Sequence, residues 1–140
     1  MPNNSYKSQI EITLSPLFKD FEWIMSPASS EALVFFENTA NEMGLDANLI
    51  KDLKGFYEVV DGIDLDVSIF SCSSPELYEF WKDDALIWIG NRDMDLIKYK
   101  DGDYHVGSSS YLNYGAEYVF TSLLDLLKAM LKEWYPDVYS

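Results

Sequence analysis

Residues 95–107 run Asp95-Leu96-Ile97-Lys98-Tyr99-Lys100-Asp101-Gly102-Asp103-Tyr104-His105-Val106-Gly107. Two short runs with apolar and aromatic side chains flank Asp101-Gly102, which is a strong signal for a two-residue β-hairpin turn. Residues 95–100 and 103–107 are therefore predicted to be antiparallel neighbours. This hairpin indicates a sheet built by local pairing, and the rest of the fold is developed outward from it.

Further strands are expected on both sides of the hairpin. The apolar run Leu86-Ile87-Trp88-Ile89-Gly90 is typical of a buried strand, and Glu117-Tyr118-Val119-Phe120 is the last strand candidate. Upstream, Leu65, Val67 and Ile69 alternate with other residues, which predicts one more strand. Ser74-Pro75 predicts the start of a short helix through Leu77, Tyr78 and Trp81.

Helical patterns lie at both ends of the chain. Ser122 and Asp125 form a capping box ahead of an apolar stripe that extends to Trp134 and is followed by Pro136, so a closing helix is predicted. In the N-terminal half, helix starts are predicted at Ser15-Pro16, at Ser26-Pro27 (ending at Gly44) and at Asp46 (ending at Asp61-Gly62).

The alternation of Ile10, Ile12 and Leu14 predicts a short strand over residues 9–14 ahead of the first of these helices. That helix is expected to bury an apolar stripe of Leu17, Phe18, Phe21, Ile24 and Met25. Helices followed by an antiparallel meander and a closing helix indicate the α+β class. With 140 residues, the chain is expected to be a single domain over residues 1–140.

Charge is the main functional signal in the composition. Twenty-four carboxylates face ten basic residues, which gives a formal net charge of −14. Residues 58–103 alone carry twelve carboxylates and four basic residues, a net charge of −8. Such a surface attracts cationic partners and repels nucleic acid and anionic membranes. The alternative is that these acidic residues only mark turns and solvated faces.

Few residues suited to catalysis are present. His105 and Cys72 are single representatives of their types, and neither has a recognisable nucleophile–base partner in the sequence, so we expect no enzymatic activity. Three D-x-D pairs begin at Asp64, Asp93 and Asp101, and such pairs can chelate Mg²⁺ or Ca²⁺ on one side of a strand. We expect turn residues instead, with no metal and no cofactor; a small metal-dependent hydrolase remains the alternative.

No apolar run approaches the roughly 20 residues of a membrane span. The first residues lack the basic and apolar regions of a secretory signal, and one cysteine cannot form an internal disulfide, so a cytoplasmic location is expected.

Among the aromatic residues, Trp88 and Trp134 lie in apolar runs and are expected inside, whereas Trp23 and Trp81 lie beside polar residues.

The order of motifs resembles that of the SUKH superfamily, the Smi/Knr-like domains, over roughly residues 28–135, and most resembles its bacterial immunity-protein branch. The motifs that carry the resemblance are Leu45-Asp46-Ala47-Asn48-Leu49 with Asp61-Gly62, Leu86-Ile87-Trp88-Ile89-Gly90 through the Asp101-Gly102 hairpin, and Phe120-Thr121-Ser122-Leu123-Leu124-Asp125. Leu45-Asp46 stands where members typically have Leu-Pro, and Asp61-Gly62 where they have Asn-Gly.

The resemblance implies a protein-binding domain that neutralises secreted toxins, often nucleases. A regulatory adaptor, which the superfamily also contains, is the alternative. The resemblance and the negative charge together predict a basic protein partner, with neither nucleic acid nor membrane as ligand. The residues expected to bind that partner are Asp61, Asp64, Asp66, Asp93, Asp95, Tyr111, Tyr114 and Trp81.

Overall fold

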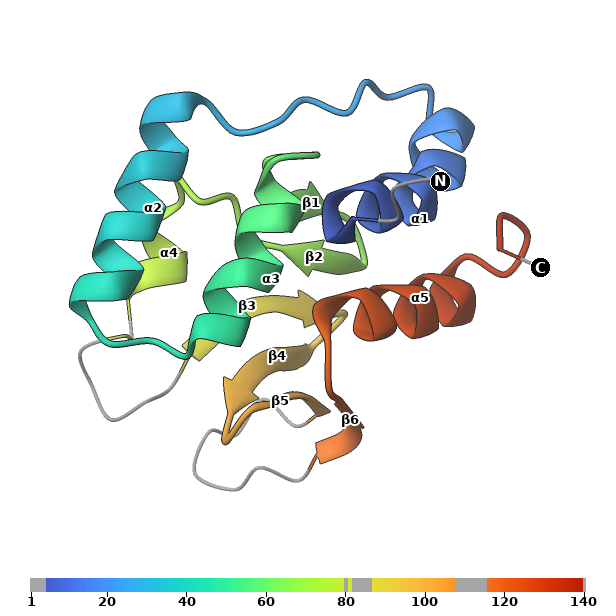
Figure 1. Cartoon of the computed structure of the whole chain (residues 1–140). Coiled ribbons are helices and arrows are strands. Elements are labelled where there is room, and N and C mark those ends of the chain that lie inside the picture. Colours follow the sequence, from blue (N-terminus) through green and yellow to red (C-terminus); the bar gives the residue numbers. More distant parts are fainter. Residues whose placement is uncertain (1–4, 80, 82–86, 108–115, 140) are drawn as a thin grey trace.

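A computed structural model of the chain describes residues 5–79, 81, 87–107 and 116–139. The helices and strands follow the predicted order of N-terminal helices, antiparallel meander and closing helix, and the predicted α+β class is confirmed (Figure 1). Their bounds are α1 Tyr6–Asp20, α2 Ser30–Glu42, α3 Ala47–Tyr57, β1 Ile63–Asp64, β2 Val67–Ile69, α4 Pro75–Tyr78, β3 Ile87–Arg92, β4 Asp95–Lys100, β5 Asp103–Gly107, β6 Ala116–Phe120 and α5 Leu123–Trp134.

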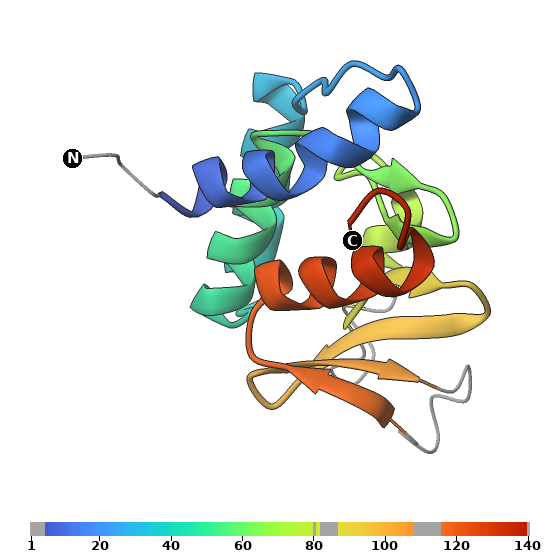
Figure 2. The same cartoon turned by 90° about the vertical axis from the view of Figure 1, so that its right-hand side faces the viewer.

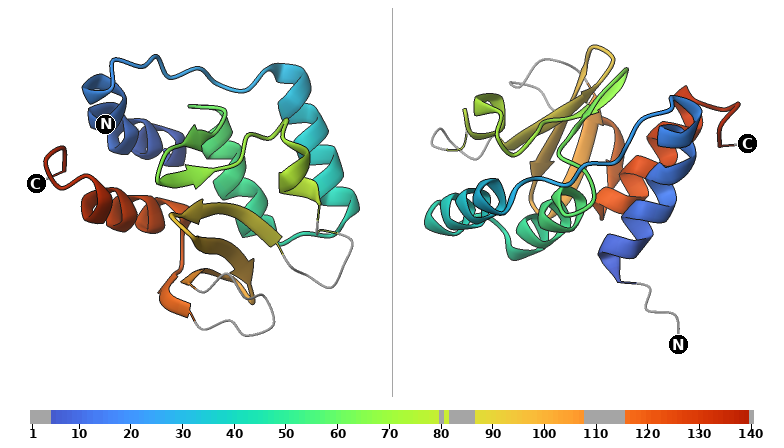
Figure 3. Two further views of the ribbon diagram at one scale, coloured as in Figure 1. Left: turned by 180° about the vertical axis from the view of Figure 1, so that it is seen from behind. Right: turned by 90° about the horizontal axis from the view of Figure 1, so that it is seen from above.

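The strands form one antiparallel sheet in sequence order, from β1 at one edge to β6 at the other. Helices α1, α3 and α5 lie together on one face of this sheet, which gives a two-layer arrangement (Figures 2 and 3). The main core lies between the layers. None of the helices in the described part of the chain combines the length and apolar character that a membrane span requires.

The Asp101-Gly102 hairpin is confirmed. Lys100 pairs with Asp103 across the turn, and both central residues have positive φ, +53° for Asp101 and +86° for Gly102. Positive φ at both positions is the pattern of the turn that best matches the twist of antiparallel strands, and Asp-Gly is a preferred pair there. The turn sets the register that directs Ile97, Tyr99, Tyr104 and Val106 to the buried face.

The strand predicted over residues 9–14 is wrong, because these residues belong to helix α1, which Ser5 caps. Ile10, Leu14, Leu17 and Phe18 are all buried at helical spacing, while Ile12 is exposed, so burial follows a period of 3.6 residues. The helix start at Ser15-Pro16 is wrong for the same reason. Pro16 lies inside α1 on its exposed side, where water can bond to the carbonyl that loses its helical partner.

Helix α2 begins at Ser30 rather than at Pro27. The Ser29 hydroxyl caps it by accepting a hydrogen bond from the Ala32 N–H at 3.1 Å. The preceding segment is extended and is attached to the end of α3, because the Ala28 N–H donates to the Tyr57 carbonyl at 2.9 Å. Figure 1 shows this segment running from α1 to α2 above β1.

Two predicted caps are confirmed. Asp46 caps α3 by accepting a hydrogen bond from the Asn48 N–H at 2.9 Å. The Ser122 hydroxyl caps α5 by accepting one from the Asp125 N–H at 3.1 Å. The apolar side of α5 is buried as predicted, except that Trp134 is only partly buried.

Tyrosine–carboxylate pairs join α3 to the sheet. The Tyr104 hydroxyl donates to Asp52 at 2.8 Å and the Tyr99 hydroxyl donates to Asp46 at 2.6 Å. Asp52 also accepts a hydrogen bond from the Leu123 N–H at 3.3 Å, at the start of α5. Burial raises the pKa of Asp52, whereas the hydrogen bond from Tyr99 lowers the pKa of Asp46.

Candidate protein-binding surface

Two of the predicted binding residues lie at the β1 edge of the sheet. Asp64 is exposed on β1, and Asp61 is half-buried just before that strand. The Asp61 carboxylate accepts hydrogen bonds from the Ser71 hydroxyl at 2.8 Å and from the Cys72 N–H at 3.1 Å. Asp61 is thus held in place by its own chain and contributes to structure as well as to charge.

Asp61 and Asp64 line a hollow of about 500 Å³. Glu76, from α4, lines the same hollow, so the structure brings together three carboxylates that are separated in sequence. Hydroxyl and amide side chains complete the polar part of the lining, namely Ser68, Ser71, Ser74 and Asn91. The hollow has the chemistry to accept a cationic group with several hydrogen-bond donors.

Asp66 and Asp93 lie in two adjacent turns of the sheet. The Asp93 N–H donates to the Asp66 carbonyl at 2.6 Å, so the β1–β2 and β3–β4 turns are adjacent. Both residues are exposed, and Asp93 has a positive φ of +53°. The sequence prediction that these carboxylates lie at strand ends and in turns is confirmed.

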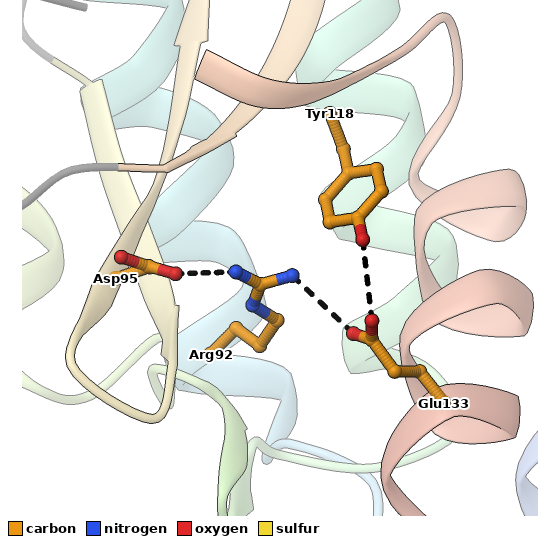
Figure 4. Close-up of polar contacts among 4 residues, drawn as sticks. All are labelled: Arg92, Asp95, Tyr118 and Glu133. Carbon is orange, nitrogen blue, oxygen red and sulfur yellow. Dashed lines mark hydrogen bonds and ion pairs between the residues drawn. The ribbon is translucent and has the colours of Figure 1, made fainter. Parts of the chain in front are cut away.

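Asp95 is engaged within the chain. Figure 4 shows Arg92 between Asp95 and Glu133, with an ion pair to each. Tyr118 donates to Glu133 at 3.2 Å, and its ring lies 5.0 Å from the Arg92 guanidinium carbon. The network joins β3, β4, β6 and α5. Because the buried Arg92 offsets the charge of Asp95, this carboxylate is the least suited of the predicted set to attract a partner.

The prediction that Trp81 lies at the surface is wrong. Its side chain is 5% exposed and packs edge-on against Phe36 and Tyr78. Its polar neighbours in sequence do not reveal that α2 and α4 enclose it. Trp88, expected inside, is only partly buried, and its indole N–H donates to the Gly90 carbonyl at 2.8 Å.

The predicted binding residues Tyr111 and Tyr114 lie outside the described residues.

Exposed apolar residues follow the end of α1, although the sequence pattern predicts that Phe21 and Ile24 belong to a buried stripe. Phe21 and Ile24 are 38% and 86% exposed, so their predicted burial is wrong. Trp23, which lies beside polar residues in the sequence, is 43% exposed. Helix α1 ends at Asp20, and residues past that end no longer follow the helical period. The signal for this was available: Trp23, Ile24 and Met25 stand directly before Ser26-Pro27, between α1 and α2.

The end of α1 fixes the position of Trp23. Glu22 has a positive φ of +58°, and its N–H donates to the Lys19 carbonyl while the Trp23 N–H donates to the Phe18 carbonyl at 2.8 Å. This is the Schellman arrangement, in which a left-handed residue ends the helix and the next side chain packs back on the last turn. Accordingly, the Trp23 ring contacts Phe18 edge-on and stacks on Phe21.

Trp23 and Ile24 line a second hollow, of about 700 Å³, together with Glu22, Asp61 and Asp64. Because the two hollows share Asp61 and Asp64, they adjoin. We call this region the β1 edge surface and define it as Glu22, Trp23, Ile24, Asp61, Asp64 and Glu76. Neither hollow has a lysine, arginine or histidine among the described residues that line it.

The two residues of the sequence best suited to nucleophilic or acid–base chemistry, Cys72 and His105, lie in different parts of the fold. Cys72 is fully buried, and burial with the nearby Asp61 raises the pKa of its thiol to about 12, so it stays protonated at neutral pH. His105 Nε2 lies 3.3 Å from the Lys100 carbonyl. No group of three or more histidine, cysteine, aspartate or glutamate side chains in the described residues is placed to hold a metal ion.

Comparison with known proteins returned no match. No family model, no curated protein and no solved structure is significantly similar to this chain.

Proposed function

We propose that this chain is a non-enzymatic protein-binding domain, an immunity protein that neutralises a basic toxin, and that the β1 edge surface contacts the toxin. One observation carries the proposal. Glu22, Asp61, Asp64 and Glu76 line two adjoining hollows, the described linings hold no basic side chain, and exposed apolar side chains stand beside them. The net charge of −14 and the resemblance to the immunity-protein branch of the SUKH superfamily support the same proposal.

The mechanism follows from charge complementarity. A toxin that acts on nucleic acid presents a basic substrate-binding surface, because its substrate is a polyanion. An acidic protein surface is attracted to that region over a Debye length and competes with the substrate for it. The attraction raises the rate of encounter, whereas packed apolar contacts mainly determine how long the complex lasts.

The test uses a basic toxin domain encoded beside the gene for this chain, with association measured by stopped flow. The variant Glu22→Gln/Asp64→Asn/Glu76→Gln removes three carboxylates from the β1 edge surface. Its matched control, Glu11→Gln/Glu42→Gln/Asp137→Asn, removes three exposed carboxylates elsewhere. We expect the on-rate to fall for the first variant and to remain much closer to wild type for the control.

Salt supplies a second readout. The wild-type on-rate should fall steeply between about 0.05 and 0.5 M salt while the off-rate changes little, since screening acts on long-range attraction. A flat on-rate over that range would rule out electrostatic steering. Equal on-rates for the two triple variants would show that the acidic residues used for binding lie elsewhere.

The effect of binding on the toxin's activity distinguishes an immunity protein from a regulatory adaptor. An immunity protein abolishes the toxin's activity when bound in equimolar amount, whereas an adaptor binds its partner and leaves that activity intact. For the hydrolase alternative, elemental analysis that finds one metal ion per chain after dialysis would overturn the non-enzymatic assignment.

A further inference from the structure

The apolar residues of the β1 edge surface indicate what kind of partner segment it accepts, in addition to the positive charge that its carboxylates favour. We propose that the hollow beside Trp23 and Ile24 holds an apolar side chain of the partner, and that lysine or arginine residues flank this side chain in the partner's sequence. The inference deepens the proposed function and rests on it, since it names the kind of segment that the same surface accepts.

The composition of the hollow supports this occupant. The apolar residues Phe18, Trp23, Ile24, Val60 and Ile63 line it together with the acidic residues Glu22, Asp61 and Asp64. An apolar group is accommodated by the first set, and cations on either side of it are accommodated by the second. Aromatic anchors surrounded by polar groups are typical of energetically important interface positions.

The surface is held in place before any partner arrives. The Schellman arrangement fixes Trp23 against Phe18, and the Asp61 N–H donates to the Ser26 carbonyl at 2.9 Å, which fixes the linker beyond Ile24 to the segment before β1. Binding to a preformed site loses less conformational entropy than binding to one that must order. Glu22 contributes in two ways, because its left-handed backbone directs Trp23 and because it lines the same hollow itself.

Charge decides between possible occupants. A second copy of this chain carries the same net charge of −14 and would bring its own excess of carboxylates to the three around the hollow. Like charges at such a contact are unfavourable, so a basic partner is the occupant that fits. The hollow beside the exposed Phe35 differs, since Glu31 is the one charged residue among its described lining residues.

The test uses two synthetic peptides with capped ends. Each has two arginine residues on either side of a central residue, which is leucine in one peptide and serine in the other. Binding is followed by the backbone amide signals of Ile24 and Gly62 and the indole signal of Trp23 in ¹⁵N-labelled protein, up to about 5 mM peptide, because affinities near 1 mM correspond to only about 4 kcal/mol.

We expect the leucine peptide to bind about three- to tenfold more tightly than the serine peptide, the range that partial burial of one leucine side chain supports. In the Ile24→Ser protein this preference should fall below about twofold, because the two changes remove the same contact. Ile12→Ser is the matched control: it also replaces an exposed isoleucine, on α1, and should keep the wild-type preference.

Equal affinity of the two peptides, or no binding of either, would overturn the inference. A preference that survives Ile24→Ser would also overturn it, because the leucine would then contact another site. These outcomes leave the charge-based toxin experiment standing. The protein could instead show a clear leucine preference at Trp23 and Ile24 but fail to bind any toxin. That result would overturn the proposed function and support the inferred binding of an apolar side chain at this surface.

Discussion

Replacing Glu22 with glycine should stabilise the fold while weakening association with a basic partner. Glu22 ends α1 with a φ of +58°, a conformation that costs an L-residue with a side chain about 1–2 kcal/mol. Glycine avoids that cost but loses about 0.5–1 kcal/mol more backbone entropy on folding. The expected net gain is therefore about 0.5–1 kcal/mol, or a rise of about 2–4 °C in the melting temperature for a chain of this size.

Urea denaturation measures the gain, and Glu22→Ala is the control. Alanine removes the same carboxylate but keeps the backbone strain, so its free energy of unfolding should stay within about 0.5 kcal/mol of wild type. If alanine stabilises as much as glycine, the gain comes from relief of repulsion with Asp61 and Asp64 rather than from φ. A loss of more than about 0.5 kcal/mol in Glu22→Gly would refute the strain argument altogether.

Three further predictions concern stability and are checked by denaturant titration. Leu127→Ala should destabilise by about 2–5 kcal/mol because Leu127 is fully buried in α5, and a loss below about 0.5 kcal/mol would contradict that burial. Gly90→Ala should cost about 2–3 kcal/mol or more, because a Cβ at this position would lie 1.9 Å from the Ser68 carbonyl oxygen and would push β2 and β3 apart; near-wild-type stability would argue against that close approach. Burial raises the folded-state pKa of Asp52, so the wild type loses stability as pH rises from the unfolded-state pKa near 4 through the folded pKa. The stability of Asp52→Asn relative to wild type should therefore rise as the pH increases above about 4, and a pH-independent difference would contradict the raised pKa.

Elements with strong local signals could be predicted from the sequence. The Asp101-Gly102 turn, the Asp46 cap and the Ser122 hydroxyl cap each involve residues a few positions apart, and all three form as predicted. Their energetics depend on backbone geometry and near neighbours, which the sequence contains directly. The α+β class follows from the order of such elements.

The N-terminal segment could not be predicted in the same way. Ile10, Ile12 and Leu14 fit both a strand and a helix, and Ser15-Pro16 resembles a helix start. The choice between strand and helix depends on which residues are buried by tertiary contacts. Ile10 and Leu14 are buried in the core that α1 shares with α3 and α5, while Ile12 faces solvent. Packing between distant segments therefore decided the local structure.

The class of the fold, the acidic character of the chain and the concentration of acidic residues in residues 58–103 could be read from the sequence, because they follow from composition and from contacts between near neighbours. Which side chains form a surface depends instead on tertiary contacts. The tertiary structure encloses Trp81 and brings Glu22, Trp23 and Ile24 beside Asp61 and Asp64. Exposure and proximity depend on elements about 40 residues apart in the chain, and no local pattern contains that information.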